Sequence, residues 1–236
     1  MSGVGRSVVD AGAVAANVHA VRERLARVVP GRVVRLVAVT KGFGADAVRA
    51  AIDAGVLDIG ESYVQELEAK ADALAADDGQ AATVAAPRWH LVGRLQRNKV
   101  RKAAPHVAWW HSVDRLSLGA EIARRAPGAT VLAQVDATGE ESKGGCPPAL
   151  LPALVDGLRD LGLDVRGLMA IGPAGPPEDA RPAFRLARAL AEQQGLGELS
   201  MGMSGDLEVA VEEGATIVRV GTDLFGPRPD RARMRH

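Results

Sequence analysis

Short apolar runs alternate with amphipathic stretches eight times along this chain, and this alternation constrains the fold more than any other feature of the sequence. Helical spacing of apolar residues marks the intervening stretches, for example residues 45–54 and 147–161. The expected strands cover residues 35–40, 56–60, 88–93, 107–113, 130–136, 165–171, 198–203 and 216–221. Eight strand–helix repeats favour a closed parallel (β/α)8 barrel, the TIM barrel, over an open sheet of eight parallel strands.

One further amphipathic stretch, residues 10–28, precedes the first expected strand, and we expect it to form an extra helix that caps the bottom of the barrel. The 236 residues are 47% hydrophobic and only 3% aromatic, which suffices for one core built from Ala, Val and Leu. We therefore expect a single α/β domain over residues 1–236. Residues 1–34 form the leading helix and its lead-in, and residues 227–236 form a basic tail.

Charge and cysteine content exclude several classes of function. The formal net charge of +0 predicts no broad surface for nucleic acid, and the basic run 94–102 is better explained as a solvated helix face than as an RNA contact. A single cysteine, Cys146, excludes an internal disulfide framework and a cysteine-based zinc cluster, and it favours a cytoplasmic location. Neither a secretory leader nor a membrane-spanning stretch is recognisable.

Lys41 follows the apolar run 36–40 directly and precedes Gly42, so a cationic side chain stands at the carboxyl end of an expected buried strand. Burial disfavours the charged ammonium, lowers its pKa and leaves a free amine that can attack an aldehyde. Two interpretations remain at this point. Lys41 is either such a nucleophile, or a lysine whose ammonium reaches the solvent at the barrel rim.

The ends of the seventh and eighth expected strands carry small and hydroxyl residues. Ser204 follows the seventh strand, and Gly221 and Thr222 follow the eighth, where backbone N–H groups and hydroxyls can surround a phosphate. The alternative is that Ser204 and Asp206 only cap a helix over residues 207–213. Both roles are compatible with each other.

Arg219 points to the opposite face from its apolar neighbours in the eighth strand, so its guanidinium enters the barrel and needs a partner there. That partner is either a carboxylate or an acceptor on a ligand, such as a pyridine nitrogen. Together Lys41, the phosphate-type loops and Arg219 match the aldehyde, the phosphate and the ring nitrogen of pyridoxal 5'-phosphate (PLP).

Eight segments in order also resemble the family of pyridoxal phosphate homeostasis proteins, over about residues 36–228. They are VAVTK at 37–41, GESYVQE at 60–66, WHLVGRLQRNK at 89–99, SVD at 112–114, ESKGG at 141–145, GLM at 167–169, LSMGMSGD at 199–206 and RVGTDLFG at 219–226. The resemblance implies an alanine-racemase-like barrel, a type III fold among PLP proteins. It also implies a role in vitamin B6 and amino-acid homeostasis without an established catalytic reaction.

The same resemblance implies that Lys41 holds PLP as an aldimine, that Arg219 faces the pyridine nitrogen, and that Ser204, Gly221 and Thr222 hold the phosphate. We add three residues to this set of candidate cofactor-binding residues: Ser62, His90 and Met169. Ser62 stands where the family often has asparagine, and serine is shorter, which leaves its contact open. For His90, a histidine satisfied within the core is favoured over a catalytic base.

Other interpretations of the sequence remain. The G-x-G-x-x-A pattern at 42–47, with Glu61 about twenty residues on, resembles a dinucleotide fingerprint, but eight repeats exceed what a Rossmann domain needs. Lys143, in a glycine-rich loop, either receives PLP in transit or faces water, and water is slightly favoured.

A PLP carrier is favoured over a low-activity amino-acid racemase or lyase, because an arginine at the ring nitrogen weakens the electron sink and the racemases' second domain is not recognisable. We expect a monomer whose PLP is delivered to PLP-dependent apoenzymes.

Overall fold

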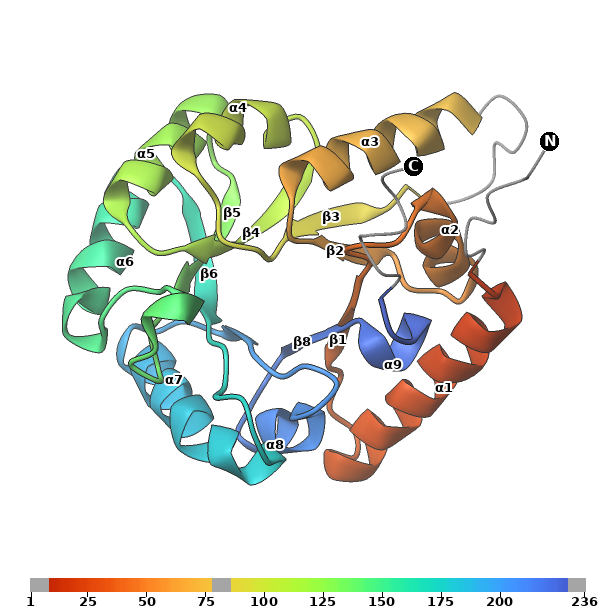
Figure 1. Cartoon of the computed structure of the whole chain (residues 1–236). Helices are drawn as coiled ribbons and strands as arrows, with labels where there is room; N and C mark the ends of the chain where they lie inside the picture. Colours follow the sequence, from red (N-terminus) through yellow and green to blue (C-terminus); the bar gives the residue numbers. More distant parts are fainter. Residues whose placement is uncertain (1–8, 78–85, 229–236) are drawn as a thin grey trace.

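Eight parallel strands close into a barrel in sequence order, with β8 pairing with β1 (Figure 1). The computed structural model describes residues 9–77 and 86–228. The strands are β1 (Arg35–Val39), β2 (Asp58–Glu61), β3 (Arg88–Leu91), β4 (Val107–Val113), β5 (Thr130–Gln134), β6 (Asp164–Met169), β7 (Glu198–Ser200) and β8 (Ile217–Val220). The expected (β/α)8 barrel is confirmed, and closure between β8 and β1 excludes the open sheet.

A helix follows each strand, and the helices form a ring around the barrel (Figure 1). The helices are α1 (Ala11–Val28), α2 (Ala45–Asp53), α3 (Val64–Asp77), α4 (Val100–Ala103), α5 (Leu116–Arg125), α6 (Leu151–Asp160), α7 (Arg181–Gln193), α8 (Leu207–Glu212) and α9 (Thr222–Phe225). Short 3-10 turns lie between some of these elements, at η1 (Arg97–Lys99), η2 (Glu141–Lys143), η3 (Pro148–Leu150) and η4 (Pro177–Ala180).

Only the expected strand 107–113 keeps its bounds, and each of the others differs at one or both ends. The second and seventh strands show how helix ends and turns override the apolar pattern. Val56 was expected to begin the second strand, but its N–H bonds back to Ala51 at 2.9 Å and Gly55 has a φ of 76°, so both residues close α2. The strand β2 therefore begins at Asp58. At β7, Gly202 has a φ of 91°, and the strand ends at Ser200 rather than at residue 203.

Helix α1 lies in the outer ring and does not cap the bottom of the barrel, which corrects our expectation. It begins at an N-cap, Asp10, whose side chain accepts hydrogen bonds from the N–H groups of Gly12 at 2.9 Å and Ala13 at 3.1 Å. Its buried stripe, from Val14 to Leu25, packs against α2, α8 and α9 (Figure 1). The single apolar stripe of α1 is buried when neighbouring helices pack against that one side. If α1 capped the barrel, the same apolar stripe would lie over polar strand ends.

The buried side chains form two clusters. The larger one lies between the strands and the helices, and the smaller one lies inside the barrel and contains Val37, Leu132, Met169 and Ile217. The remaining barrel interior holds buried polar side chains, among them those of His90, His111, Ser200 and Arg219. Buried polar groups need hydrogen-bond partners, so these side chains form a candidate site inside the barrel.

Candidate functional site

The closed barrel brings four of the candidate loops together at the carboxyl ends of neighbouring strands. Ser62 follows β2, Lys41 follows β1, and the loops of Ser204 and Gly221 follow β7 and β8. In the β8–β1 register Val37 lies opposite Arg219. A Cβ on Gly221 would stand 3.1 Å from the carbonyl oxygen of Val39, so glycine allows these two strand ends to approach closely.

Lys41 is half-buried, one residue beyond the end of β1. Burial lowers the pKa of its ammonium, and the positive charges of Arg228 and Arg219 lower it further, against the carboxylates of Glu61 and Glu66. A lowered pKa increases the fraction of free amine near neutral pH. Lys41 therefore has the chemistry of a nucleophile toward an aldehyde.

A buried ion pair holds the backbone directly before Lys41. Glu61 is fully buried at the end of β2 and accepts hydrogen bonds from the Thr40 hydroxyl at 2.5 Å and from the Lys70 ammonium. The Lys70 ammonium also donates to the Thr40 carbonyl at 2.7 Å. The Gly42 N–H donates to Glu66 at 2.7 Å, so α3 anchors the chain on both sides of Lys41. Sequence reasoning did not single out Lys70; its position one helical turn after Glu66 was the available signal.

Arg219 is 5% exposed inside the barrel, and its partners are not the carboxylate that we considered. One terminal nitrogen, Nη1, donates to the carbonyl and to the hydroxyl of Ser200, both at 2.7 Å, and Nη2 donates to the carbonyl of Ala170 at 3.1 Å. Burial lowers the pKa of Arg219 to about 10, so it stays protonated at neutral pH. These bonds occupy three of its five N–H groups, and within the described residues two remain for a ligand.

Ser204 links the loops after β7 and β8. Its hydroxyl accepts a hydrogen bond from the N–H of Asp223 at 3.2 Å, at the start of α9. Asp206 stands at the N-cap position of α8 without a capping hydrogen bond to that helix, and it accepts from the N–H of Met203 at 2.6 Å instead. The capping alternative therefore does not describe Ser204, and Ser204, Gly221 and Thr222 come from two adjacent loops.

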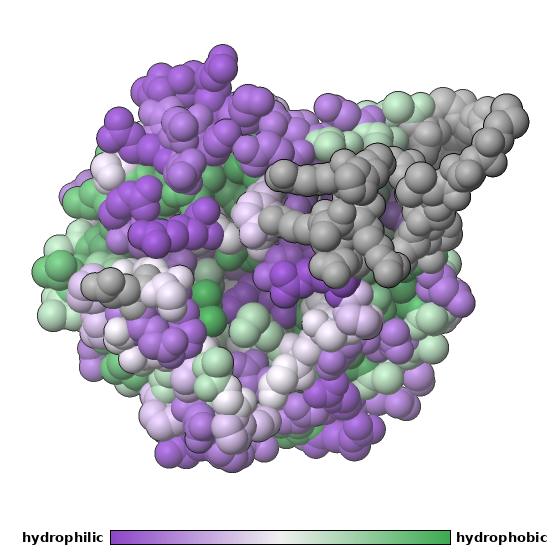
Figure 2. Space-filling model, in the orientation of Figure 1, coloured by the Kyte–Doolittle hydropathy of each residue, from purple (hydrophilic) through white to green (hydrophobic). Residues whose placement is uncertain are grey.

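Arg228 is a second cation beside Lys41 that sequence reasoning missed, because we assigned it to the basic tail. A Cβ on Gly42 would stand 3.5 Å from the Cδ atom of Arg228, so this side chain lies against the loop of Lys41. The rings of Phe43 and Phe225, 5.4 Å apart, join the same loop to α9. Hydrophilic residues gather near the middle of this barrel face (Figure 2). Residues 229–236 of the tail lie outside the described residues.

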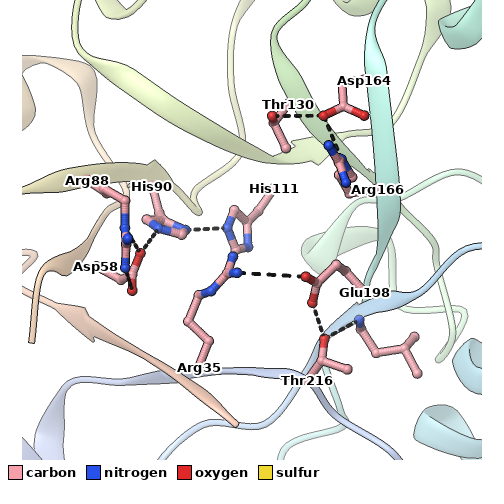
Figure 3. Close-up of polar contacts among 11 residues, drawn as sticks. Arg35, Asp58, Arg88, His90, His111, Thr130, Asp164, Arg166, Glu198 and Thr216 are labelled. Carbon is pink, nitrogen blue, oxygen red and sulfur yellow. Dashed lines mark hydrogen bonds and ion pairs between the residues drawn. The ribbon is translucent and has the colours of Figure 1, made fainter. Parts of the chain in front are cut away.

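His90 and Met169 lie inside the barrel. Met169 is 1% exposed and packs in the inner apolar cluster. His90 is fully buried, and its ring bonds to Asp58 and to His111, each at 2.9 Å (Figure 3). The favoured interpretation of His90 as a satisfied core histidine matches this geometry. His111 was not recognised from the sequence, although both histidines lie on neighbouring strands.

The remaining candidates have defined places. Ser62 is half-buried, and a Cβ on Gly93 would meet its carbonyl oxygen at 2.3 Å, so the ends of β2 and β3 touch there. Lys143 is half-buried and pairs with Glu140. Glu61, considered as the acidic residue of a dinucleotide fingerprint, is instead buried against Lys70. Thus Glu61 cannot contact a ribose.

Neither a metal-holding cluster nor a membrane-spanning helix is found within residues 9–77 and 86–228. Over these residues no group of three or more His, Cys, Asp or Glu side chains could hold a metal ion. Over the same part of the chain, no helix is both long enough and apolar enough to cross a membrane.

Comparison with known proteins gives consistent matches. The family model described as "Alanine racemase, N-terminal domain" matches residues 9–229. The pyridoxal phosphate homeostasis protein of Pseudomonas aeruginosa is 44% identical over 204 residues, which cover 83% of this chain and 85% of that protein.

Two solved structures share the fold. A protein of unknown function from Bifidobacterium adolescentis is 36% identical with a TM-score of 0.83, and the match covers 95% of this chain and all of that one. PipY of Synechococcus elongatus, solved with PLP bound, is 37% identical with a TM-score of 0.77, and the match covers 90% of this chain and all of PipY.

Proposed function

This chain belongs to the alanine racemase N-terminal domain family and, within it, to the pyridoxal phosphate homeostasis proteins, and we propose that it binds PLP and takes part in PLP and amino-acid homeostasis. The observation that carries the proposal is the pairing of β1 with β8. This pairing sets a half-buried lysine of lowered pKa beside a buried arginine with free donors.

The residues present fit the three ends of the cofactor. The free amine of Lys41 would hold the aldehyde end through a C=N bond, whose formation would release the aldehyde oxygen as water. The two unused N–H groups of Arg219 suit the pyridine nitrogen, which accepts a hydrogen bond. The phosphate fits the loops of Ser204 and of Gly221–Thr222, and Arg228, which lies against the neighbouring loop of Lys41, adds a positive charge on this side of the barrel. Contacts of Ser62, His90 and Met169 with the cofactor stay proposals. The side chains of His90 and Met169 lie inside the barrel.

Holding the cofactor, rather than catalysing a reaction on an amino acid, follows from the chemistry of Arg219. When bound, PLP supplies an electron sink whose strength depends on a protonated ring nitrogen. Arg219 stays protonated and can only donate, so it keeps that nitrogen unprotonated. The relatives' names describe homeostasis and not an enzymatic reaction. We therefore propose that this protein catalyses no reaction at a metabolic rate.

The attachment to Lys41 is tested by adding PLP to the purified protein, reducing with borohydride and locating the adduct by peptide mapping. We expect one reducible adduct per chain on Lys41 and none in the Lys41→Ala variant. Lys143→Ala, which removes another half-buried lysine, should keep the adduct. A stoichiometric adduct that persists on another residue in Lys41→Ala would refute the assignment.

Racemase or lyase activity is tested with the same preparations, by chiral analysis of alanine and serine and by α-proton exchange in deuterated water. We expect neither racemisation nor exchange at a useful rate. Rapid exchange that depends on Lys41 would establish the enzyme instead. Three further statements stay predictions: that the protein is a monomer, that it acts in the cytoplasm, and that PLP-dependent apoenzymes receive its PLP.

A further inference from the structure

A continuous chain of hydrogen bonds crosses the barrel interior and ends on Arg219. It starts at the amino end of β2 and runs across β3 and β4 to β7, and we call it the buried chain. Its members are Asp58, His90, His111 and Ser200. Successive contacts measure 2.9 Å from Asp58 Oδ1 to His90 Nε2, 2.9 Å from His90 Nδ1 to His111 Nε2 and 2.9 Å from His111 Nδ1 to Ser200 Oγ. The Ser200 hydroxyl then meets Nη1 of Arg219 at 2.7 Å. Figure 3 shows the part that joins Asp58 to His111.

Both histidines of this chain are neutral at physiological pH. Burial lowers the pKa of His90, although the carboxylate of Asp58 opposes this effect. Burial lowers the pKa of His111 well below its ordinary value, and the charge of His90 would lower it further. Burial raises the pKa of the Asp58 carboxyl, but hydrogen bonds from His90 and Arg88 outweigh it and hold that pKa below its ordinary value. Asp58 is therefore ionised.

With neutral rings, the two ends of the chain determine where each proton lies. The Asp58 carboxylate can only accept, so His90 carries its proton on Nε2 and accepts on Nδ1. His111 must then donate from Nε2 and accept on Nδ1, and the Ser200 hydroxyl donates to it. Arg219 can only donate to that hydroxyl. Every donor in the chain thus points from the arginine toward the carboxylate.

Arg219 depends on this arrangement because it makes no hydrogen bond to a carboxylate among the described residues. The charge of Asp206 stabilises the guanidinium without a hydrogen bond. The aligned dipoles that end on Asp58 add to this, and such alignment strengthens each bond in a low-dielectric interior. The Ser200 hydroxyl also fixes the orientation of Nη1, which in turn fixes the direction of the two unused N–H groups.

We propose that the buried chain positions Arg219 for the cofactor, with the Asp58 carboxylate at the far end of the barrel setting the direction of every hydrogen bond. This inference rests on the proposed function only for the identity of the ligand that Arg219 faces. The members of the chain are positioning residues, because Arg219 alone among them would contact the ring nitrogen.

The direction of the chain is tested without cofactor, by two-bond 1H–15N correlation spectra of the histidine rings, assigned by single substitution. We expect the wild type to show both rings neutral with the proton on Nε2. In Asp58→Asn the amide can donate as well as accept, so the Nδ1-protonated form should rise in both rings together. Asp164→Asn is the matched control, since Asp164 begins β6 and pairs with Arg166 and Thr130 away from the histidines (Figure 3). A cationic ring in the wild type, rings that respond separately or unchanged rings in Asp58→Asn would overturn the inference.

The effect on Arg219 is tested with PLP labelled with 15N at the ring nitrogen. We expect Ser200→Ala to shift the ring-nitrogen signal and to weaken PLP binding about tenfold, the effect of one hydrogen bond to a charged group. The adduct on Lys41 should still form. Asp58→Asn should shift the same signal, and Asp164→Asn should not. Unchanged signals in both test variants would refute positioning. Failure of the wild type to bind PLP would instead refute the proposed function. The direction of the buried chain would then still be tested by the histidine spectra recorded without cofactor.

Discussion

Replacing Lys70 by methionine should destabilise the fold far more than removing a lysine from an exposed ion pair. Methionine keeps most of the side-chain volume but leaves the carboxylate of Glu61, which is fully buried, without its cation. The Thr40 carbonyl also loses a donor at 2.7 Å. One oxygen of Glu61, Oε2, already has no hydrogen-bond partner within the described residues. Breaking a buried pair by removing one partner costs about 3–5 kcal/mol of unfolding free energy at neutral pH.

The matched control is Lys102→Met, because Lys102 pairs with Glu68 at 3.6 Å and its side chain is 51% exposed. Exposed pairs contribute about 0–1 kcal/mol. Urea unfolding, followed by the fluorescence of the three tryptophans, should therefore separate the two variants clearly. If Lys70→Met loses no more unfolding free energy than Lys102→Met, our account of the Glu61–Lys70 pair is wrong.

The destabilisation of Lys70→Met should shrink as the pH falls. Burial raises the pKa of Glu61, and removing Lys70 removes the group that most opposes that rise, while the Thr40 hydroxyl remains. Above the unfolded-state pKa of about 4.3, Glu61 is ionised in the unfolded chain but tends to keep its proton in the folded variant. The stability of Lys70→Met therefore falls as the pH rises. Between pH 7 and pH 5 the difference from the wild type should narrow by up to about 2.7 kcal/mol. A difference that stays constant or widens at pH 5 would contradict this reasoning.

Three further predictions concern the cofactor site. In spectral titrations, Arg219→Ala should weaken PLP binding about ten- to a hundredfold, while Lys41 still forms its adduct. Arg219→Glu should add slow α-proton exchange or transamination, because a carboxylate favours a protonated ring nitrogen. Pyridoxal without phosphate should bind about ten- to a hundredfold more weakly than PLP, and equal affinities would refute the phosphate site formed by Ser204, Gly221 and Thr222. Arg228→Gln should raise the pKa of Lys41, so that competitive labelling of its amine shows a midpoint at higher pH, and an unchanged midpoint would show that Arg228 exerts no charge effect there.

The periodicity of the chain predicted the barrel because each strand and helix carries its own local pattern. The expected strand 107–113 coincides with β4, and the leading helix begins and ends within one residue of its expected bounds. Errors arose where local backbone geometry overrides hydrophobicity. At Val56, the helix-terminating turn at Gly55 takes the valine away from β2. The expected position of α1, capping the bottom of the barrel, was wrong. A single apolar stripe shows that one side of a helix is buried, but it does not show which elements cover that side.

Site residues were predictable where a reactive or charged side chain stands within, or directly after, an apolar strand in the same short segment. Lys41 follows an apolar strand, and Arg219 is a cation within one, so each was recognisable alone. The partners of these residues were not. Lys70 anchors the segment of Lys41 from a helix 29 positions later, and Arg228 reaches Gly42 from the other end of the chain. Sequence spacing carries no information about such contacts.

The amino-acid sequence alone therefore determined the number and order of the elements, the closed barrel and the residues capable of reacting with an aldehyde, because these follow from hydrophobic period and side-chain chemistry. Only the tertiary structure decided what surrounds those residues. Barrel closure brings β8 beside β1, and the register of the strands places His90, His111 and Ser200 within hydrogen-bond distance across the interior. The physical reason is that hydrogen bonds and pKa shifts depend on distances of a few ångströms between residues far apart in the chain, and those distances exist only once the barrel has closed.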